Sequence, residues 1–144
     1  MSPLIAFDAD VLIYAADLGN PFGAAIRKLF QGTNEEAAGV GSVLLLTEVL
    51  SKPMRENDTS PEVATLLGLL SRLELLDFDR ASARLALALS IEHGLRAADA
   101  AHLATAVAAG ADYFLTNNRK DFPKGIVEID VIYPPDLAEH EGLL

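Results

Sequence analysis

The run Leu4-Ile5-Ala6-Phe7-Asp8-Ala9-Asp10-Val11-Leu12-Ile13-Tyr14, near the start of the chain, decides how the rest of the sequence is interpreted. Apart from its two acids the run is apolar and rich in β-branched and aromatic side chains. This pattern predicts a strand buried on both faces at the centre of a parallel sheet. An ionised carboxylate in such surroundings is strongly destabilising unless it is paired. The simplest partner for Asp8 and Asp10 is a cation.

The overall composition favours helices that cover a buried sheet in one domain. The chain has 144 residues, of which 51% are hydrophobic, and this length suits a single core. We expect one domain over residues 1–135 and an acidic tail over residues 136–144. No charge-free apolar run is long enough to span a membrane, and no signal peptide is evident at the start. These features predict a cytoplasmic protein without a membrane partner.

The ionisable residues limit the chemistry that the chain can perform. There is no Cys and there are only three His, so thiolate nucleophiles and sulfur-ligated metals are excluded. A bound metal would therefore have oxygen ligands. The net charge of −10 counts, taken alone, against a nucleic-acid partner, because phosphate binding usually requires a basic patch.

Strand-like and helix-like segments alternate along the chain without hairpin turn signals. Helices are predicted from Asn20-Pro21 to Gly32, from a cap at Ser42 to Lys52-Pro53, from Ser60-Pro61 onward, from a cap at Asp79 to His93-Gly94, and from Ala97 to Ala109. Further short strands are predicted at residues 40–41, 75–79, 113–116 and 126–131, and regular structure is expected to end at Pro134-Pro135. This order implies an α/β fold with parallel strands and helices on both faces.

Several polar side chains stand near the ends of these elements, where the local pattern calls for apolar or neutral residues. They are Asp8, Glu48, Asp99, Asn118 and Asp121. In open parallel sheets the ligand crevice lies beyond the carboxyl ends of the strands, where the strand order reverses. Residues after the first strand and after the strand ending at Thr116 would meet there if those strands are neighbours.

Taken one at a time, all of the acids except Asp8 have a structural explanation. Glu48 can pair with Lys52, four residues further along a helix, and Asp99 can interact with a helix dipole. Asp121 suits a turn, as does Asp10 at the opening of a loop. Taken together, three acids at one sheet edge suit a hard divalent cation, which prefers carboxylate oxygens and keeps several waters.

Four segments in order also carry a resemblance to a known family. They are Leu4 to Tyr14, Ser42-Val-Leu-Leu-Leu-Thr-Glu-Val-Leu50, Gly94-Leu-Arg-Ala-Ala-Asp-Ala-Ala-His-Leu-Ala104 and Leu115-Thr-Asn-Asn-Arg-Lys-Asp-Phe122. They resemble the signature segments of PIN domains, in particular those of the small VapC-type toxins. The resemblance implies a three-layer α/β/α sandwich with a central parallel sheet and an endoribonuclease that depends on Mg²⁺ or Mn²⁺. It also implies an RNA substrate, a homodimer, and a small antitoxin protein that inserts a segment into the active-site groove.

The same resemblance implies roles for the acids. Asp8, Asp99 and Glu48 correspond to the family's metal ligands, and Glu48 would also orient or deprotonate the attacking water. The fourth and more variable acidic position falls on Asn118 or Asp121, and Asp121 is our candidate for the fourth catalytic acid.

Other positions are candidates for contacts with the substrate. They are Thr116, Asn118, Arg119, Lys52 and Arg55. Asp10 occupies a place where Asn or Ser is more common in the family, so its charge would either tighten metal binding or hinder the approach of phosphate. His102, three residues after Asp99, is expected to be a packed or half-exposed side chain.

Three other functions agree with the sequence. The chain could be a PIN nuclease in RNA processing or one that acts on DNA, without a toxin role. It could be an inactive PIN-like binding module, which the acidic charge and Asn118 would suit. A phosphatase-like enzyme would also use Asp8-x-Asp10 after a strand, but it would leave the segments around Glu48 and Asp99 without a purpose.

Overall fold

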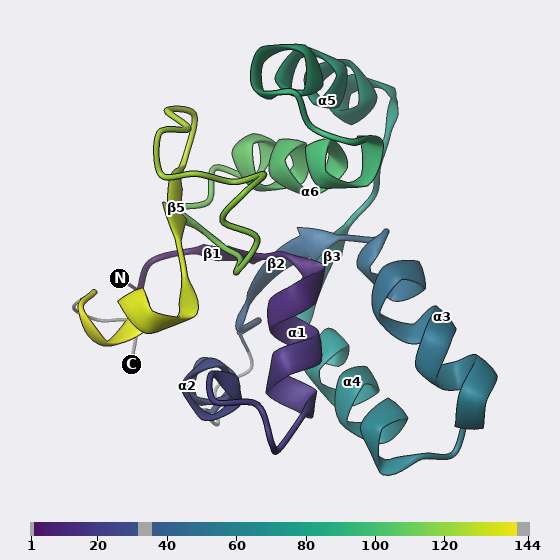
Figure 1. The fold of residues 1–144 in the computed structure, drawn as a ribbon. Coiled ribbons are helices and arrows are strands. Elements are labelled where there is room, and N and C mark those ends of the chain that lie inside the picture. Colours follow the sequence, from purple (N-terminus) through teal and green to yellow (C-terminus); the bar gives the residue numbers. More distant parts are fainter. Residues whose placement is uncertain (1, 32–35, 141–144) are drawn as a thin grey trace.

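A five-stranded sheet forms the middle of the molecule and holds helices on both of its faces (Figure 1). The computed structural model describes residues 2–31 and 36–140. The strands are β1 (Ile5–Phe7), β2 (Gly39–Ser42), β3 (Leu73–Leu76), β4 (Tyr113–Leu115) and β5 (Asp130–Ile132). All neighbouring strands pair in parallel.

The strand order is β3-β2-β1-β4-β5, so the chain starts at the centre of the sheet. It first builds outward through β2 and β3, and then crosses back to place β4 on the other side of β1. Ala6 of β1 faces Val40 on one side and Phe114 on the other. The order of the strands therefore reverses between β1 and β4, and this is where open sheets of this kind bind ligands.

The helices form two layers, one on each face of the sheet (Figure 1). Their bounds are α1 (Ala9–Ala16), α2 (Gly23–Lys28), α3 (Leu45–Asn57), α4 (Pro61–Ser71), α5 (Arg80–His93) and α6 (Ala97–Ala108), followed by a short 3₁₀ helix, η1 (Pro134–Ala138). Ile5 and Phe7 of β1 pack on the side of α1 to α4, whereas Ala6 packs on the side of α5 and α6. The predicted three-layer fold with a central parallel sheet is thus confirmed.

The first apolar run was predicted to be a strand, but it divides into a short strand and a helix. Only Ile5–Phe7 is a strand, and Ala9–Ala16 is helix α1. The Asp8 carboxylate accepts a hydrogen bond from the Ala9 backbone N–H at 2.8 Å, which caps the helix directly after the strand. Val11, Leu12 and Ala15 are fully buried on this helix. A continuous apolar run suits a buried helix as well as a buried strand, so its pattern cannot separate the two.

The boundaries of helix α3 also differ from the prediction. Ser42 ends β2, and its hydroxyl accepts the Leu44 backbone N–H at 3.1 Å, so Leu45 rather than Ser42 opens the helix region. The helix continues through Pro53 to Asn57. An interior Pro costs a helix about 3 kcal/mol, and burial of Val49 and Leu50 in the preceding turn offsets that cost.

The C-terminal region is more regular than expected. The last strand begins at Asp130 instead of residue 126. Ile126 and Ile129 lie in the loop before it, and their side chains are buried there. Regular structure continues past Pro134-Pro135 into η1, where Leu137 is buried and Asp136 pairs with Lys124 at 2.6 Å. Residues 141–144 of the predicted tail and Gly32, the predicted end of the second helix, lie outside the described residues; α2 itself spans Gly23–Lys28.

The predicted caps of the later helices are confirmed. Ser60 accepts the Val63 N–H at 3.1 Å to begin α4, and Asp79 accepts the Ser82 N–H at 2.8 Å to begin α5. Gly94 follows α5 in the left-handed conformation, with φ of 67°. Among the helices of the described residues, none has the length and hydrophobicity required to cross a membrane.

Two glycines should respond in opposite ways to alanine. Gly94→Ala places a Cβ on a left-handed residue and should lower the free energy of unfolding by about 1 kcal/mol. Gly68 lies exposed inside α4, where an added Cβ meets nothing within 4 Å, so Gly68→Ala should raise stability by about 0.5–1 kcal/mol. Urea unfolding followed by circular dichroism measures both, and changes of equal sign would contradict the expectation.

Candidate active site

Asp8 and Thr116 join the ends of the two central strands. The Asp8 backbone N–H donates to the Leu115 carbonyl at 3.0 Å, which continues the pairing of β1 and β4. The Thr116 hydroxyl donates to Asp8 Oδ2 at 2.8 Å, while Asp8 Oδ1 accepts the Ala9 N–H. Both side chains are buried. The carboxylate of Asp8 is therefore fixed at the point where the strand order reverses.

Burial dominates the electrostatics of Asp8. The loss of water raises the pKa of its carboxyl, and the nearby charge of His102 and the bond from Thr116 only partly oppose this effect. The charge of Glu48 raises the same pKa further. A carboxylate in this position is best stabilised by a cation.

Asp10 is a second desolvated acid, in the first turn of α1. Its Oδ2 accepts the Asn117 backbone N–H at 3.0 Å and so ties α1 to the loop after β4. Its Oδ1 is buried and has no hydrogen-bond partner among the described residues. Burial, followed by the charge of Asp8, raises the pKa of Asp10 to about 7.

Asp99 approaches the same region from the first turn of α6. Burial raises the pKa of its carboxyl first, and the charges of Asp8, Asp121 and Glu48 raise it further. These acids come from four separate segments of the chain. The fold therefore brings the other three predicted catalytic carboxylates within electrostatic reach of Asp99.

Glu48, on α3, is held from α6. Its Oε2 lies 3.1 Å from Nε2 of His102, and this contact is the main cause of a lowered pKa for Glu48. The sequence suggested that Glu48 pairs with Lys52. In the described part of the chain, Glu48 instead pairs with His102. His102 itself is 2% exposed.

Asn118 and Asp121 share one tight turn after β4. The Asn118 amide donates to Asp121 Oδ2 at 3.0 Å, and the Asp121 N–H donates to Asn118 Oδ1 at 3.3 Å. The Asn118 N–H also donates to the Thr116 hydroxyl at 3.0 Å. The Asn118 amide thus orients the Asp121 carboxylate, and the charge of Asp121 raises the pKa of Asp99.

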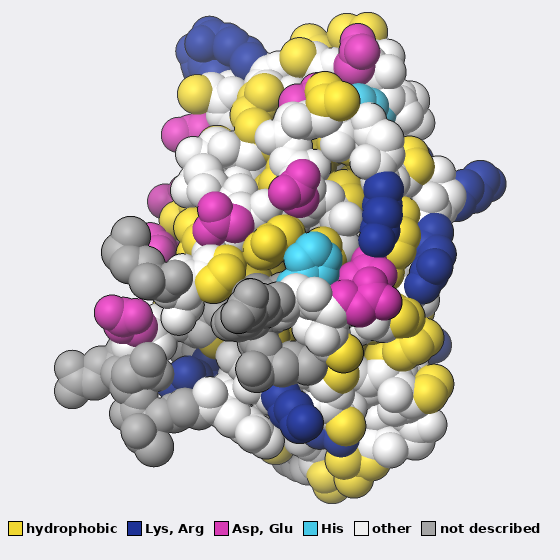
Figure 2. Space-filling model, turned by 90° about the vertical axis from the view of Figure 1, so that its left-hand side faces the viewer, with side chains coloured by type: hydrophobic (Ala, Val, Ile, Leu, Met, Phe, Trp, Pro, Cys, Tyr) yellow, Lys and Arg dark blue, Asp and Glu magenta, His cyan; other side chains and the backbone are white. Residues whose placement is uncertain are grey.

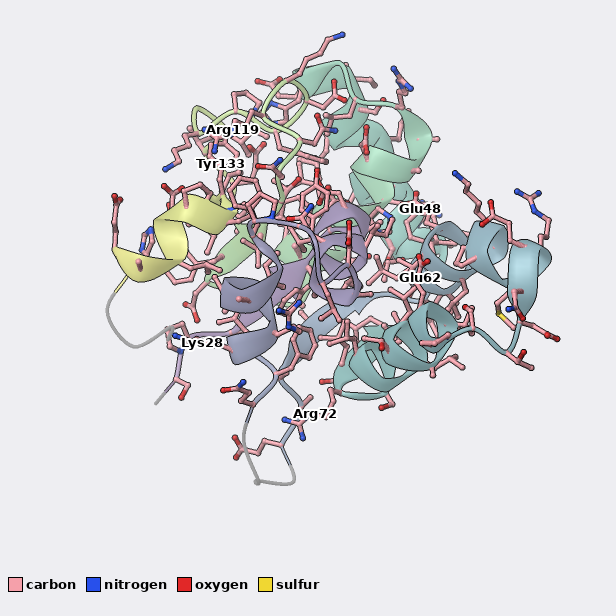
Figure 3. The ribbon with its side chains drawn as sticks, turned by 60° about the horizontal axis from the view of Figure 1, so that its bottom comes forward. Lys28, Glu48, Glu62, Arg72, Arg119 and Tyr133 are labelled. Carbon is pink, nitrogen blue, oxygen red and sulfur yellow. The ribbon has the colours of Figure 1, made fainter. Side chains whose placement is uncertain are left out.

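The candidate cations for substrate binding lie apart from one another. Lys52 and Arg55 are exposed on α3, after Glu48. The Arg119 guanidinium lies over the Tyr133 ring, 4.5 Å from its centroid, and Figure 3 shows this pair well separated from Glu48. On the face shown in Figure 2, Lys and Arg side chains stand singly among acidic and apolar ones.

A groove begins beside Glu48 and runs between α1, α3 and α4. Its apolar lining includes Ile13, Val49 and Pro53, and its volume is about 310 Å³. Charged side chains complete the lining: Glu48, Lys52, Glu56 and Glu62. Figure 3 shows Glu48 and Glu62 near each other on this side of the molecule. We call this hollow the α3–α4 groove.

The carboxylate oxygens of Asp8, Asp10 and Asp99 are the type of ligand that a hard divalent cation prefers. Among residues 2–31 and 36–140, no three His, Asp or Glu side chains converge into a ready-made metal cage. Mg²⁺, however, is usually held by only one or two carboxylates and keeps several waters. The desolvated carboxyl of Asp8, the unpartnered Oδ1 of Asp10 and the carboxyl of Asp99 are oxygen donors of this kind. The charge of His102 offsets only part of the negative charge on Asp8 and Asp99.

Two contacts in this region were not expected from the sequence. His102 is packed, as expected, but it also contacts Glu48, and its polarity within an Ala-rich helix was the only signal of that contact in the sequence. The link from Asp10 to Asn117 joins residues that are 107 positions apart. Both contacts depend on the packing of distant elements, and local patterns do not report on such packing.

Comparison with known proteins identifies the family. The PIN domain model matches residues 5–125, and the chain belongs to the PIN domain family. The resemblance in the four sequence segments is thereby confirmed. A search among curated proteins gave no match.

Solved structures with the same fold include several toxin–antitoxin proteins. A toxin–antitoxin complex from Klebsiella pneumoniae has a TM-score of 0.68 and 23% identity, covering 91% of this chain and 97% of that chain. VapBC2 from Rickettsia felis, bound to a DNA fragment from its promoter, has a TM-score of 0.68 and 20% identity, covering 90% and 98%. VapC20 from Mycobacterium tuberculosis, a toxin that cleaves the sarcin–ricin loop, has a TM-score of 0.63 and 15% identity, covering 88% and 98%.

Proposed function

We propose that this PIN domain is a divalent-metal-dependent endoribonuclease and the toxin of a toxin–antitoxin pair, acting in the cytoplasm. The observation that carries the proposal is the group of four acids, Asp8, Glu48, Asp99 and Asp121, at the strand-order reversal of a PIN fold. The fold it shares with a sarcin–ricin loop cleaving toxin and with toxin–antitoxin complexes supports RNA as the substrate.

Each acid has a distinct part in the proposed reaction. Asp8 and Asp99 would hold Mg²⁺ or Mn²⁺, with Glu48 as a further ligand and Asp121 as the fourth acid. A bound divalent ion lowers the pKa of water and neutralises charge that develops on the scissile phosphate. Glu48 has a lowered pKa and therefore stays ionised, which is the state required to orient or deprotonate the attacking water.

The neighbouring polar residues would support the acids and the substrate. Thr116 holds Asp8 by its hydroxyl, and Asn118 holds Asp121 by its amide. Lys52 and Arg55, which are exposed on α3, would contact RNA phosphates. Arg119, stacked on Tyr133, would contact RNA only at the far end of the turn that carries Asp121.

The α3–α4 groove is the place where we expect an antitoxin segment to bind. Its apolar floor suits aliphatic side chains, and the three carboxylates of Glu48, Glu56 and Glu62 favour a basic residue on the partner. A segment seated there would cover Glu48. We further propose that the protein is a homodimer, as the family resemblance implies.

A cleavage assay tests the proposed function. Purified protein is incubated with structured RNAs in Mg²⁺, in Mn²⁺ or in EDTA, and the products are separated by gel electrophoresis. We expect metal-dependent internal cuts, and their suppression by a small protein encoded next to the toxin. RNA binding without cleavage in any metal would instead identify an inactive binding module.

A further inference from the structure

His102 occupies a position where an apolar side chain would be expected. It lies in the middle of α6, flanked by the buried residues Ala101 and Leu103, and is itself 2% exposed. An imidazole loses its hydration in such a place. Among the described residues, neither ring nitrogen makes a hydrogen bond of good geometry, and the polar group that approaches the ring is the Glu48 carboxylate, with Oε2 3.1 Å from Nε2.

The contact joins two elements of the proposed site. His102 Nε2 lies 3.1 Å from Glu48 Oε2, across the space between α6 and α3. His102 follows Asp99 by three residues, so the two side chains are neighbours on one side of the helix. One turn of α6 therefore carries both Asp99, an acid of the site, and His102, which contacts the acid Glu48.

Glu48 needs such a restraint. Its side chain is 35% exposed and belongs to a long, flexible residue type, whereas Asp8 is fixed by bonds to both of its oxygens. Replacing a buried ion pair by well-packed apolar residues is often neutral or stabilising. Stability alone thus gives no reason to keep an imidazole at this position.

We propose that His102 is a positioning residue that holds the Glu48 carboxylate toward the acids of the site. The proposal rests on the proposed function, in which Glu48 accepts the proton of the attacking water. In this role His102 acts through Glu48, and it is assigned no contact with the substrate or with the reacting atoms.

Three variants measure the role of His102 in catalysis. His102→Leu should fold with an unchanged or higher melting temperature, while kcat for RNA cleavage falls about tenfold and KM stays the same. His102→Gln retains a donor of similar reach and should restore most of kcat. Adding His102→Leu to Glu48→Gln should cause no further loss, because both changes remove the same interaction.

The matched control is His93→Leu, which removes another His–Glu pair, with Glu128 at 2.9 Å, outside the site. It should leave kcat unchanged. A cleavage rate of His102→Leu equal to that of the unaltered protein, or a loss that adds fully to that of Glu48→Gln, would overturn the positioning role.

A second readout does not depend on activity. In metal-free protein with ¹⁵N-labelled histidine, Glu48→Gln should move the imidazole signals of His102 and leave those of His93 in place. Unmoved His102 signals would overturn the proposed contact. Absence of RNA cleavage by the unaltered protein in every metal would overturn the proposed function instead, so the two failures are distinguishable.

Discussion

Asp99→Asn should reduce the rate of RNA cleavage by about 10³-fold while the protein remains folded. Asp99 is one of the two proposed holders of the metal ion, and the charge stabilisation that a metal gives to a phosphate transition state amounts to several kcal/mol. Loss of one carboxylate ligand should remove most of that effect. Single-turnover cleavage of a structured RNA in Mg²⁺ measures the rate.

The fold should tolerate this change. Burial first, and then repulsion by Asp8, Asp121 and Glu48, raise the pKa of Asp99. A neutral amide relieves both effects and so offsets the loss of a favourable charge at the N-terminus of α6, about 0.3–1 kcal/mol. The melting temperature should therefore stay the same or rise. Asp130→Asn, at an exposed position on β5, is the control. Cleavage by Asp99→Asn within about threefold of the unaltered rate would contradict the role assigned to Asp99.

Asp10→Asn should stabilise the metal-free protein by about 2–4 kcal/mol at pH 8, and by little near pH 4. Folding raises the pKa of Asp10 from 3.8 to about 7, by burial first and the charge of Asp8 second. The folded state therefore binds a proton that the unfolded state releases, and stability falls as the pH rises from about 4 to about 7. Above pH 7 this loss is complete.

An amide at position 10 removes the titration and still accepts the Asn117 N–H. The stability difference between Asp10→Asn and the unaltered protein should thus grow between pH 4 and pH 7 and then level off. Urea unfolding in EDTA at pH 4.5, 6 and 8, followed by circular dichroism, measures it, with Asp130→Asn as the control. A difference that does not change with pH would show that burial of the Asp10 charge is not its cause.

The layered fold was predictable because its signals are local. The caps at Ser60 and Asp79 and the left-handed Gly94 mark helix ends through contacts within a few residues. Alternation of strands and helices then requires a parallel sheet. The boundary at Asp8 was not predictable, because one carboxylate ends β1 and caps α1 within an unbroken apolar run.

The candidate site was predictable in its acids but not in their partners. Asp8, Glu48, Asp99 and Asp121 stand out as charges in apolar or small-residue surroundings, and the position of strand ends predicts that some of them meet. Which side chain pairs with Glu48 depends on how α6 packs near α3. The spacing along α3 therefore suggested Lys52 as the partner of Glu48, whereas the packing of α6 provides His102.

The hydrogen bond from Thr116 to Asp8 spans 108 positions of the chain. A polypeptide growing on the ribosome makes β1 first, yet the strand that completes the surroundings of Asp8 is β4, which is synthesised only after α6. Nascent chains that stop before β4 thus carry Asp8, Glu48 and Asp99 but lack Asp121 and Thr116, whose hydroxyl holds Asp8. The sheet order delays completion of the acidic centre until β4 and the turn after it have been synthesised, so products truncated before β4 should not cleave RNA.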